Sequence, residues 1–137
     1  MTAYRCHGHY LARGGTCREG MAELLGKATG CAQGRGGSMH FYDAKNHFMG
    51  GWGIIGAQVP LAAGIAFAQK YQTNKSVTLC FLGDGAINIG PFHEGLSLAA
   101  LWKLPVVYII ENNHFSMGTP LERTAPTDDL SIRALGY

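Results

Sequence analysis

The chain has 137 residues and a formal net charge of +2; 47% of its residues are hydrophobic and 15% are charged. This composition excludes a disordered chain, because it provides enough apolar surface to bury a core. The small net charge and the lack of a basic run give no electrostatic case for a nucleic-acid or membrane-surface partner.

The cysteines are far apart in the sequence and form no C-x-x-C pair; they are Cys6, Cys17, Cys31 and Cys80. This spacing argues against a zinc ribbon and against a redox dithiol, and it predicts reduced structural thiols in an intracellular protein. The first residues lack the apolar core of a signal peptide. The longest apolar stretch, residues 59–68, is too short to span a bilayer.

Residues 1–11 alternate loosely between apolar and polar side chains, which predicts an extended segment. On a strand, His7 and His9 would lie on the same side. No third ligand stands near them in the sequence, so a structural role is favoured over a metal site.

A helix is predicted next, because Thr16 and Glu19 have the spacing of a capping box ahead of an apolar helical face. We expect this helix to end near Gly30. The following residues 34–40 are rich in glycine. Such a loop cradles phosphate in some proteins but is more often a connector, and the role of His40 stays open.

Residues 51–56 match the pattern G-x-G-x-x-G. A dinucleotide-binding turn needs a strand before it and an acidic residue about twenty positions later, and neither is present here. The segment is predicted instead to open a helix over residues 57–71, with Pro60 in its first turn.

Two apolar runs, residues 77–82 and 106–110, predict buried strands that each end in small polar residues. Residues 88–104 between them have helical periodicity, and Pro91 suits a first helical turn. Strand, helix and strand predict a parallel βαβ unit, whose strand ends meet at one edge of the sheet.

Asp84 and Asn113 would both lie at that edge, where they offer a carboxylate oxygen and a carboxamide oxygen. Gly83 and Gly85 allow a tight turn and the close approach of a ligand, and the next helix start offers amide donors to phosphate. This donor set suits Mg²⁺ bound together with phosphate oxygens. A magnesium–diphosphate site is therefore one interpretation, and a helix N-cap role for Asp84 is the other.

The order Gly83-Asp84-Gly85, then residues 86–111, then Asn112-Asn113 resembles the thiamin diphosphate signature. Four further segments resemble the alpha-subunit family of the pyruvate dehydrogenase decarboxylating component; they are residues 4–9, 34–40, 53–61 and 99–105. Members of that family are much longer. Residues 1–137 are therefore expected to be a single partial domain, an internal fragment that carries the diphosphate- and Mg²⁺-binding core.

The resemblance implies an α/β fold: a mainly parallel sheet with helices on both faces, the diphosphate-binding half of a thiamin diphosphate enzyme. It implies oxidative decarboxylation of pyruvate with acetyl transfer to a lipoyl group, and thiamin diphosphate and Mg²⁺ as cofactors. The implied partners are a beta subunit in an α₂β₂ tetramer and a lipoyl-bearing acetyltransferase, in the bacterial cytoplasm or the mitochondrial matrix. The alternatives are a branched-chain 2-oxoacid or acetoin dehydrogenase subunit, and a non-catalytic cofactor-binding or assembly fragment.

The resemblance also assigns cofactor contacts to the first part of the chain. Tyr4 and Arg5 match residues that contact the aminopyrimidine side of the cofactor and its diphosphate. The backbone carbonyls of Gly53 and Ile55 match acceptors for the aminopyrimidine ring, and the Ile55 side chain would support the V shape of the cofactor.

Further along the chain, the resemblance implies that Asp84, Asn113 and the backbone carbonyl of Phe115 bind Mg²⁺. Gly85 and Ala86 complete the implied cofactor-binding set. The catalytic histidines of the family lie outside this segment, and the glutamate that activates the cofactor comes from the beta subunit. The fragment alone is therefore expected to be inactive.

The sequence departs from the family pattern at two places. The two glutamines that follow the signature in the family are absent from residues 87–91. A serine that is a regulatory phosphorylation site in mammalian members falls at Pro120, so this control is not expected here.

Overall fold

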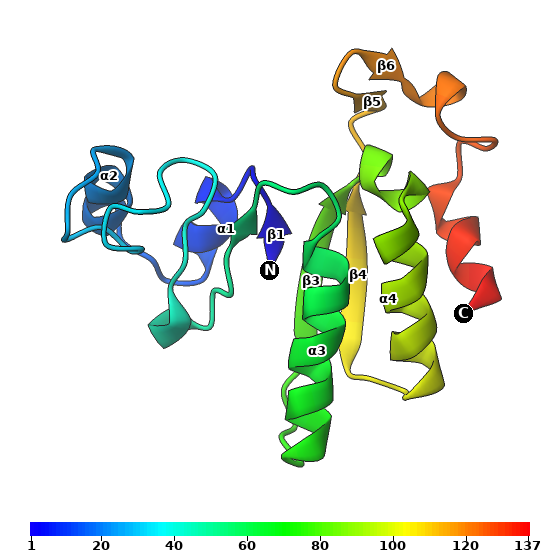
Figure 1. The fold of residues 1–137 in the computed structure, drawn as a ribbon, viewed down its shortest axis with the longest axis horizontal. Coiled ribbons are helices and arrows are strands. Elements are labelled where there is room, and N and C mark those ends of the chain that lie inside the picture. Colours follow the sequence, from blue (N-terminus) through cyan, green and yellow to red (C-terminus); the bar gives the residue numbers. More distant parts are fainter. The chain divides into compact units, whose positions relative to one another are not determined.

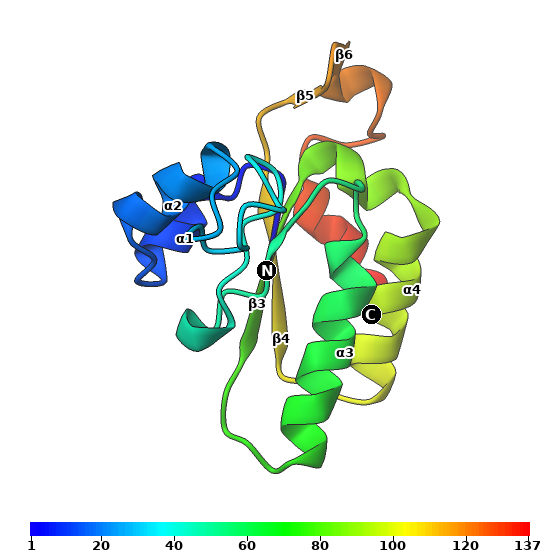
Figure 2. The ribbon, with the colours of Figure 1, turned by 60° about the vertical axis from the view of Figure 1, so that its left-hand side comes forward.

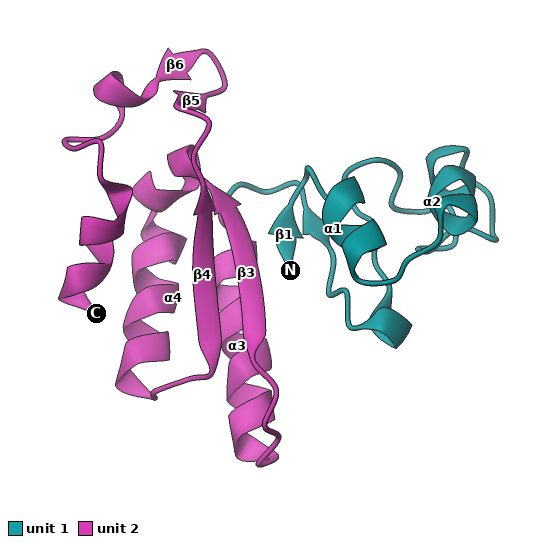
Figure 3. Cartoon of the chain, turned by 180° about the vertical axis from the view of Figure 1, so that it is seen from behind, with its two compact units in different colours: residues 1–55 teal, residues 56–137 magenta.

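The computed structural model describes residues 1–137, and the chain divides into unit 1, residues 1–55, and unit 2, residues 56–137 (Figure 3). Each unit contains its own pair of parallel strands. A single partial domain over the whole chain stays a prediction. The expected site residues are divided between the two units: Tyr4, Arg5, Gly53 and Ile55 belong to unit 1, and the others belong to unit 2.

Unit 2 is built on two parallel strands, β3 (Thr78–Gly83) and β4 (Val106–Glu111), which pair along their whole length. Helix α4 (Gly90–Leu101) connects them, and helix α3 (Gln58–Tyr71) precedes β3 (Figure 1). The predicted parallel βαβ unit is therefore confirmed, as is the helix expected over residues 57–71.

Both long helices lie on one face of the strand pair (Figure 2). Alternate side chains of β3 are buried on this face; they are Thr78, Cys80 and Leu82. Leu79, which points to the other face, is 47% exposed. The two helices approach closely, since a Cβ atom on Gly95 of α4 would lie 2.8 Å from Val59 Cγ1 of α3. Helices on the second face, which the resemblance implied, are not part of this unit.

The helix predicted over residues 88–104 is shorter than expected at both ends. Asp84–Asn88 form a 3₁₀ helix, Ile89 is extended with φ −96° and ψ 153°, and α4 follows with Pro91 in its first turn. At the other end, Lys103 has a φ of 48°, which an α-helix does not accommodate. Local backbone geometry therefore sets both boundaries.

After β4, an antiparallel hairpin pairs β5 (Phe115–Ser116) with β6 (Thr119–Pro120). Its turn includes Met117 in the left-handed region, with a φ of 55°. Two 3₁₀ helices follow, over Leu121–Arg123 and Leu130–Gly136. The hairpin thus begins just after Asn113 and contains Phe115, the expected carbonyl ligand.

Unit 1 pairs two short parallel strands, β1 (Thr2–Ala3) and β2 (Gly51–Trp52). Its helices are α1 (His7–Ala12) and α2 (Cys17–Leu24), and a 3₁₀ helix covers Ala44–Asn46. Four buried side chains form its hydrophobic core; they are Cys6, Tyr10, Phe41 and Phe48.

The expectation that residues 1–11 are extended is wrong from the start of α1 onward. A helical turn brings Cys6 and Tyr10 to the same side of the chain, because residues four apart share a helix face. The Tyr10 ring packs edge-on against Phe41 and Phe48, with ring centroids 5.1 and 6.0 Å apart. Contacts with rings far along the chain therefore decide this local structure.

Helix α2 begins as predicted, since Thr16 Oγ1 accepts a hydrogen bond from the Glu19 N–H at 3.1 Å. It ends at Leu24, whereas the sequence predicted an end near Gly30. The residues after it turn away from a helical path, with Gly26 at a φ of 66°. The cap is confirmed and the length is wrong.

The prediction that α2 packs an apolar face against unit 1 is also wrong. Met21 and Leu24 are 56% and 40% exposed, whereas the buried residues of the helix are Gly20 and Glu23. The helix therefore turns a carboxylate inward, and the partners of that carboxylate explain why.

The longest helix of the chain, α3, has 14 residues. None of the helices combines the length and the hydropathy of a candidate membrane span.

Candidate functional site

Asp84 and the Asn112-Asn113 pair leave the same edge of the β3–β4 strand pair. The last residues in register are Gly83 and Glu111, so the next residues of both strands continue from one edge. The predicted placement of both polar segments at the carboxyl ends of parallel strands is confirmed. Open α/β sheets bind ligands at this edge.

The Asp84 side chain is 2% exposed, and its Oδ2 atom has no hydrogen-bond partner. The alternative N-cap role is wrong, because Gly83 is the N-cap of the 3₁₀ helix and Asp84 is its first residue. A buried carboxylate oxygen without a partner is unfavourable unless a cation or a donor compensates it. The buried Asp84 oxygen therefore fits a metal ligand.

The Ser116 hydroxyl is also buried without a hydrogen-bond partner. It lies against Gly85, where a Cβ atom would overlap Ser116 Oγ, so the approach of β5 requires glycine at this position. Gly83 differs, because its φ of −76° is ordinary and a Cβ atom there would meet nothing within 4 Å. The tight turn expected at Gly83 is wrong, and its backbone borders open space.

The two asparagines turn the chain at the end of β4. Asn112 Oδ1 accepts a hydrogen bond from the His114 N–H at 2.9 Å, and Asn113 Oδ1 accepts one from the Phe115 N–H at 3.0 Å. His114 has a φ of 65°, which this sharp turn requires. An amide oxygen has two lone pairs, so Asn113 Oδ1 keeps one for a metal ion while it holds Phe115 in place.

In unit 1, Tyr4 and Gly53 likewise follow the ends of two parallel strands. The last pair in register joins the ends of β1 and β2, so the next residues lie at the same edge. The Arg5 guanidinium carbon lies 5.9 Å from the centre of the Tyr4 ring, and Ile55 is 47% exposed. The four residues assigned to the cofactor in this unit therefore lie at or just beyond one strand edge.

His40 lies directly against this edge. Its Nδ1 atom is 3.1 Å from the Gly51 carbonyl oxygen. A Cβ atom at Gly53 would lie 3.1 Å from His40 Cε1, tighter than most side-chain contacts. Glycine at position 53 therefore makes room for the imidazole beside the turn that the resemblance assigns to the aminopyrimidine ring.

Glu23 occupies several of the backbone donors that the glycine-rich loop would otherwise offer to a phosphate. Its buried carboxylate accepts hydrogen bonds from four backbone N–H groups, those of Ala32, Gly34, Gly36 and Gly37. Burial alone would raise the pKa of Glu23, but these four donors outweigh it and lower the pKa. Sequence reasoning missed this residue; its only signal was a glutamate on the helix just before a glycine-rich stretch.

His7 also contacts this loop. Its Nε2 atom is 2.9 Å from the Ser38 carbonyl oxygen, and its ring stacks on Phe41 with centroids 4.6 Å apart. Across the chain, no group of three or more His, Cys, Asp or Glu side chains is arranged to hold a metal ion. The structural role favoured for His7 agrees with these contacts.

The four cysteines are unpaired, and Cys6 and Cys80 are buried. Burial raises the pKa of the Cys80 thiol to about 12, so this side chain is protonated at neutral pH and is a poor nucleophile. The two buried thiols, Cys6 and Cys80, therefore act as small core side chains.

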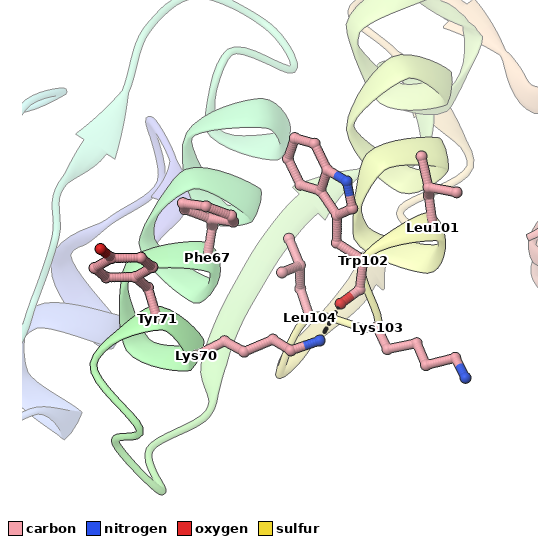
Figure 4. A pocket seen from close by; sticks show the side chains of 7 residues that line it. All are labelled: Phe67, Lys70, Tyr71, Leu101, Trp102, Lys103 and Leu104. Carbon is pink, nitrogen blue, oxygen red and sulfur yellow. Dashed lines mark hydrogen bonds between the residues drawn. The ribbon is translucent and has the colours of Figure 1, made fainter.

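A pocket of about 430 Å³ lies at the opposite end of unit 2, where β3 and β4 begin (Figure 4). Its walls include the rings of Phe67, Tyr71 and Trp102, and the Lys70 ammonium donates a hydrogen bond to the Trp102 carbonyl. Lys70 thereby satisfies the carbonyl at the C-cap of α4. The pocket contains none of the predicted site residues.

Comparison with known proteins identifies what the chain is similar to. The family model described as "Dehydrogenase E1 component" matches residues 1–137. The pyruvate dehydrogenase E1 component subunit alpha of Rhizobium meliloti is 50% identical over 137 residues, which cover 100% of this chain and 39% of the relative.

Two other relatives have the same subunit name. That of Rickettsia bellii is 52% identical over 130 residues, 95% of this chain and 40% of the relative. The mitochondrial subunit alpha-1 of rice is 54% identical over 125 residues, 91% of this chain and 32% of the relative. The chain thus spans at most 40% of the length of these relatives. Because the family model matches residues 1–137, this chain belongs to the dehydrogenase E1 component family.

Proposed function

We propose that this chain is the diphosphate- and Mg²⁺-binding part of a pyruvate dehydrogenase alpha subunit that uses thiamin diphosphate. One observation carries the metal site: the Asp84 carboxylate is buried at the carboxyl end of a parallel strand pair with Oδ2 unpartnered. Relatives named pyruvate dehydrogenase subunit alpha support the choice of substrate.

In this proposal, Asp84, Asn113 and the Phe115 carbonyl hold Mg²⁺, and the Mg²⁺ holds the diphosphate. One carboxylate and two neutral oxygens leave coordination positions for phosphate oxygens and water, which Mg²⁺ prefers. The backbone amides of Gly85 and Ala86, at the start of the 3₁₀ helix, would donate hydrogen bonds to the diphosphate.

In this proposal, the site residues of unit 1 contact the aminopyrimidine ring and also the diphosphate. Tyr4 and Arg5 contact the aminopyrimidine side and the diphosphate, where a guanidinium pairs well with phosphate oxygens. The carbonyls of Gly53 and Ile55 accept hydrogen bonds from the aminopyrimidine, and the exposed Ile55 side chain supports the bent cofactor. When bound, thiamin diphosphate supplies the carbon nucleophile and the electron sink for decarboxylation.

The complete reaction requires other chains. We propose a beta subunit in an α₂β₂ tetramer, and a lipoyl-bearing acetyltransferase that accepts the acetyl group. The name "subunit alpha" of the relatives supports the need for a partner subunit, and their bacterial and mitochondrial sources support the bacterial cytoplasm or the mitochondrial matrix. The chain alone is expected to show no turnover of pyruvate.

Calorimetric titration tests the metal site. Thiamin diphosphate is titrated, with and without Mg²⁺, into the chain mixed with a beta subunit. We expect Mg²⁺-dependent heat that the Asp84→Ala variant lacks and that the matched Asp128→Ala control, which changes an exposed aspartate, retains. Equal heat from wild type and Asp84→Ala would contradict the assignment of Asp84.

A further inference from the structure

Glu23 is an unusual residue for the buried face of a helix, because it carries a charge and is 0% exposed. Each of its two carboxylate oxygens accepts two backbone hydrogen bonds. Oε2 accepts the N–H groups of Ala32 and Gly34, both at 2.8 Å. Oε1 accepts those of Gly36 and Gly37, at 2.7 and 3.2 Å. The carboxylate is fully compensated by the loop that wraps around it.

The loop is folded around this anion with no space to spare. A Cβ atom at Gly30 would lie 2.6 Å from Glu23 Cα. One at Gly34 would lie 2.8 Å from the Lys27 carbonyl oxygen. Glycines of this kind and successive inward N–H groups form an anion-binding concavity. In this chain the anion is a side chain of the protein itself.

The end of the same loop contacts residues in or directly beside both segments of unit 1 that the proposed function assigns to the cofactor. The Ser38 carbonyl accepts hydrogen bonds from Cys6 Sγ at 3.4 Å and from His7 Nε2 at 2.9 Å, directly after Tyr4 and Arg5. Gly36 is packed so closely on the His40 carbonyl that a Cβ atom would overlap it.

His40 extends this connection to the second cofactor segment. Its Nδ1 atom meets the Gly51 carbonyl at 3.1 Å, and its ring lies against Gly53. The stretch from residue 32 to residue 40 therefore connects the Glu23 carboxylate to both cofactor segments of unit 1.

We propose that Glu23 is a positioning residue: its carboxylate holds the loop of residues 32–40, and the loop sets the two cofactor-contacting segments of unit 1. This inference rests on the proposed function for what those segments bind. Glu23 itself touches no cofactor atom in this proposal; it acts through Ser38 and His40.

The proposal predicts chemical rescue. The Glu23→Ala variant keeps Cβ and removes a group with the size and charge of acetate, which leaves four N–H donors around an empty space. Added acetate should enter this space and restore the loop. Chloride at the same ionic strength should not, since it cannot accept bonds with two separate oxygens.

The test uses the chain together with a beta subunit and Mg²⁺. Calorimetry gives the dissociation constant of thiamin diphosphate, and trypsin cleavage after the exposed Arg35 reports on the loop independently of the cofactor. For Glu23→Ala, we expect a dissociation constant raised by about tenfold or more and faster cleavage after Arg35. Acetate should reverse both changes by at least about threefold. The control Glu19→Ala, on the same helix and exposed, should respond to acetate in neither assay.

Each outcome decides a different claim. Wild-type affinity in a folded Glu23→Ala variant overturns the positioning role, and so does a loss of affinity that acetate does not reverse. The absence of Mg²⁺-dependent binding by wild type overturns the proposed function, and with it the cofactor role of the loop. If acetate still protects Arg35 of Glu23→Ala from trypsin in that case, Glu23 anchors the loop but has no role in cofactor binding.

Discussion

The two units solve opposite electrostatic problems, one at the edge of a parallel strand pair and the other in a glycine-rich loop. In unit 2, the β3–β4 edge holds a buried carboxylate, Asp84, with one oxygen unpartnered. In unit 1, a cluster of backbone N–H groups requires an anion, and the buried Glu23 carboxylate provides it from within the unit. The first arrangement is incomplete without a cation, and the second is complete.

This difference separates a ligand site from a scaffold more reliably than the sequence motifs do. A glycine-rich loop and a Gly-Asp-Gly turn are both compatible with phosphate binding when read from the sequence. Four backbone donors of the loop and its approach already have the Glu23 carboxylate as acceptor, whereas Asp84 Oδ2 has no partner. Whether buried polar atoms have partners is therefore the informative property.

The largest expected effect is on the satisfied carboxylate. Glu23→Ala should lower the free energy of unfolding by about 3 kcal/mol or more, because four partly buried N–H groups lose a charged acceptor. Urea unfolding at neutral pH measures this change. The Glu19→Ala control should lose about 1 kcal/mol or less. Equal losses of unfolding free energy in the two variants would contradict the claim that the Glu23 carboxylate stabilises the loop.

The same residue predicts a pH dependence with a defined sign. The folded-state pKa of Glu23 is lowered from its ordinary 4.5, so its stabilisation is fully present above that value. The contribution is lost as the pH falls through the lower folded-state pKa. Between neutral and acidic pH, wild type should therefore lose more stability than Glu23→Ala. Parallel unfolding free energies in urea titrations across this range would contradict the assignment.

Removing the Asp84 carboxylate should have the opposite effect on the free energy of unfolding. Without ligand, Asp84→Ala should raise the free energy of unfolding by about 2 kcal/mol, because an uncompensated buried oxygen is removed. Thermal or urea unfolding in the presence of a chelator measures this gain. The exposed Asp128→Ala control should change little. A destabilised Asp84→Ala chain would mean that the side chain has a structural partner.

Two glycines beside Asp84 give a smaller and more local test. Gly85→Ala should cost about 1.5 kcal/mol of unfolding free energy, since its Cβ overlaps the Ser116 hydroxyl. Adding Ser116→Gly should recover most of that loss. Gly83→Ala should be nearly neutral in the ligand-free chain, because its φ is −76° and its Cβ meets nothing. Similar losses at both glycines would contradict this packing.

Patterns of neighbouring residues predicted the parts of this chain that local chemistry determines. The period of the apolar runs gave the parallel βαβ unit and hence the shared edge of Asp84 and Asn113. The Thr16 cap also follows from two residues three apart. The helix expected after residues 51–56 follows from the same local pattern, since this segment leads into α3.

The failures occur where distant residues decide. Helix α1 forms because Tyr10 packs on Phe41 and Phe48, which no local pattern records. The sequence did not single out Glu23, because its four donors follow it in a loop without a recognised motif. Tertiary hydrogen bonds and ring contacts of this kind override propensity.

The smallest expected effect tests whether unit 1 also depends on its local cap. Thr16→Ala should lower the free energy of unfolding by about 1 kcal/mol, because the Glu19 N–H loses its acceptor. Thr16→Ser keeps the hydroxyl and should stay near wild type. In a double variant with Glu23→Ala, the two losses should add if the cap and the loop are independent. A combined loss that departs from the sum by more than about 0.5 kcal/mol would show that the start of α2 and the carboxylate near its end act together.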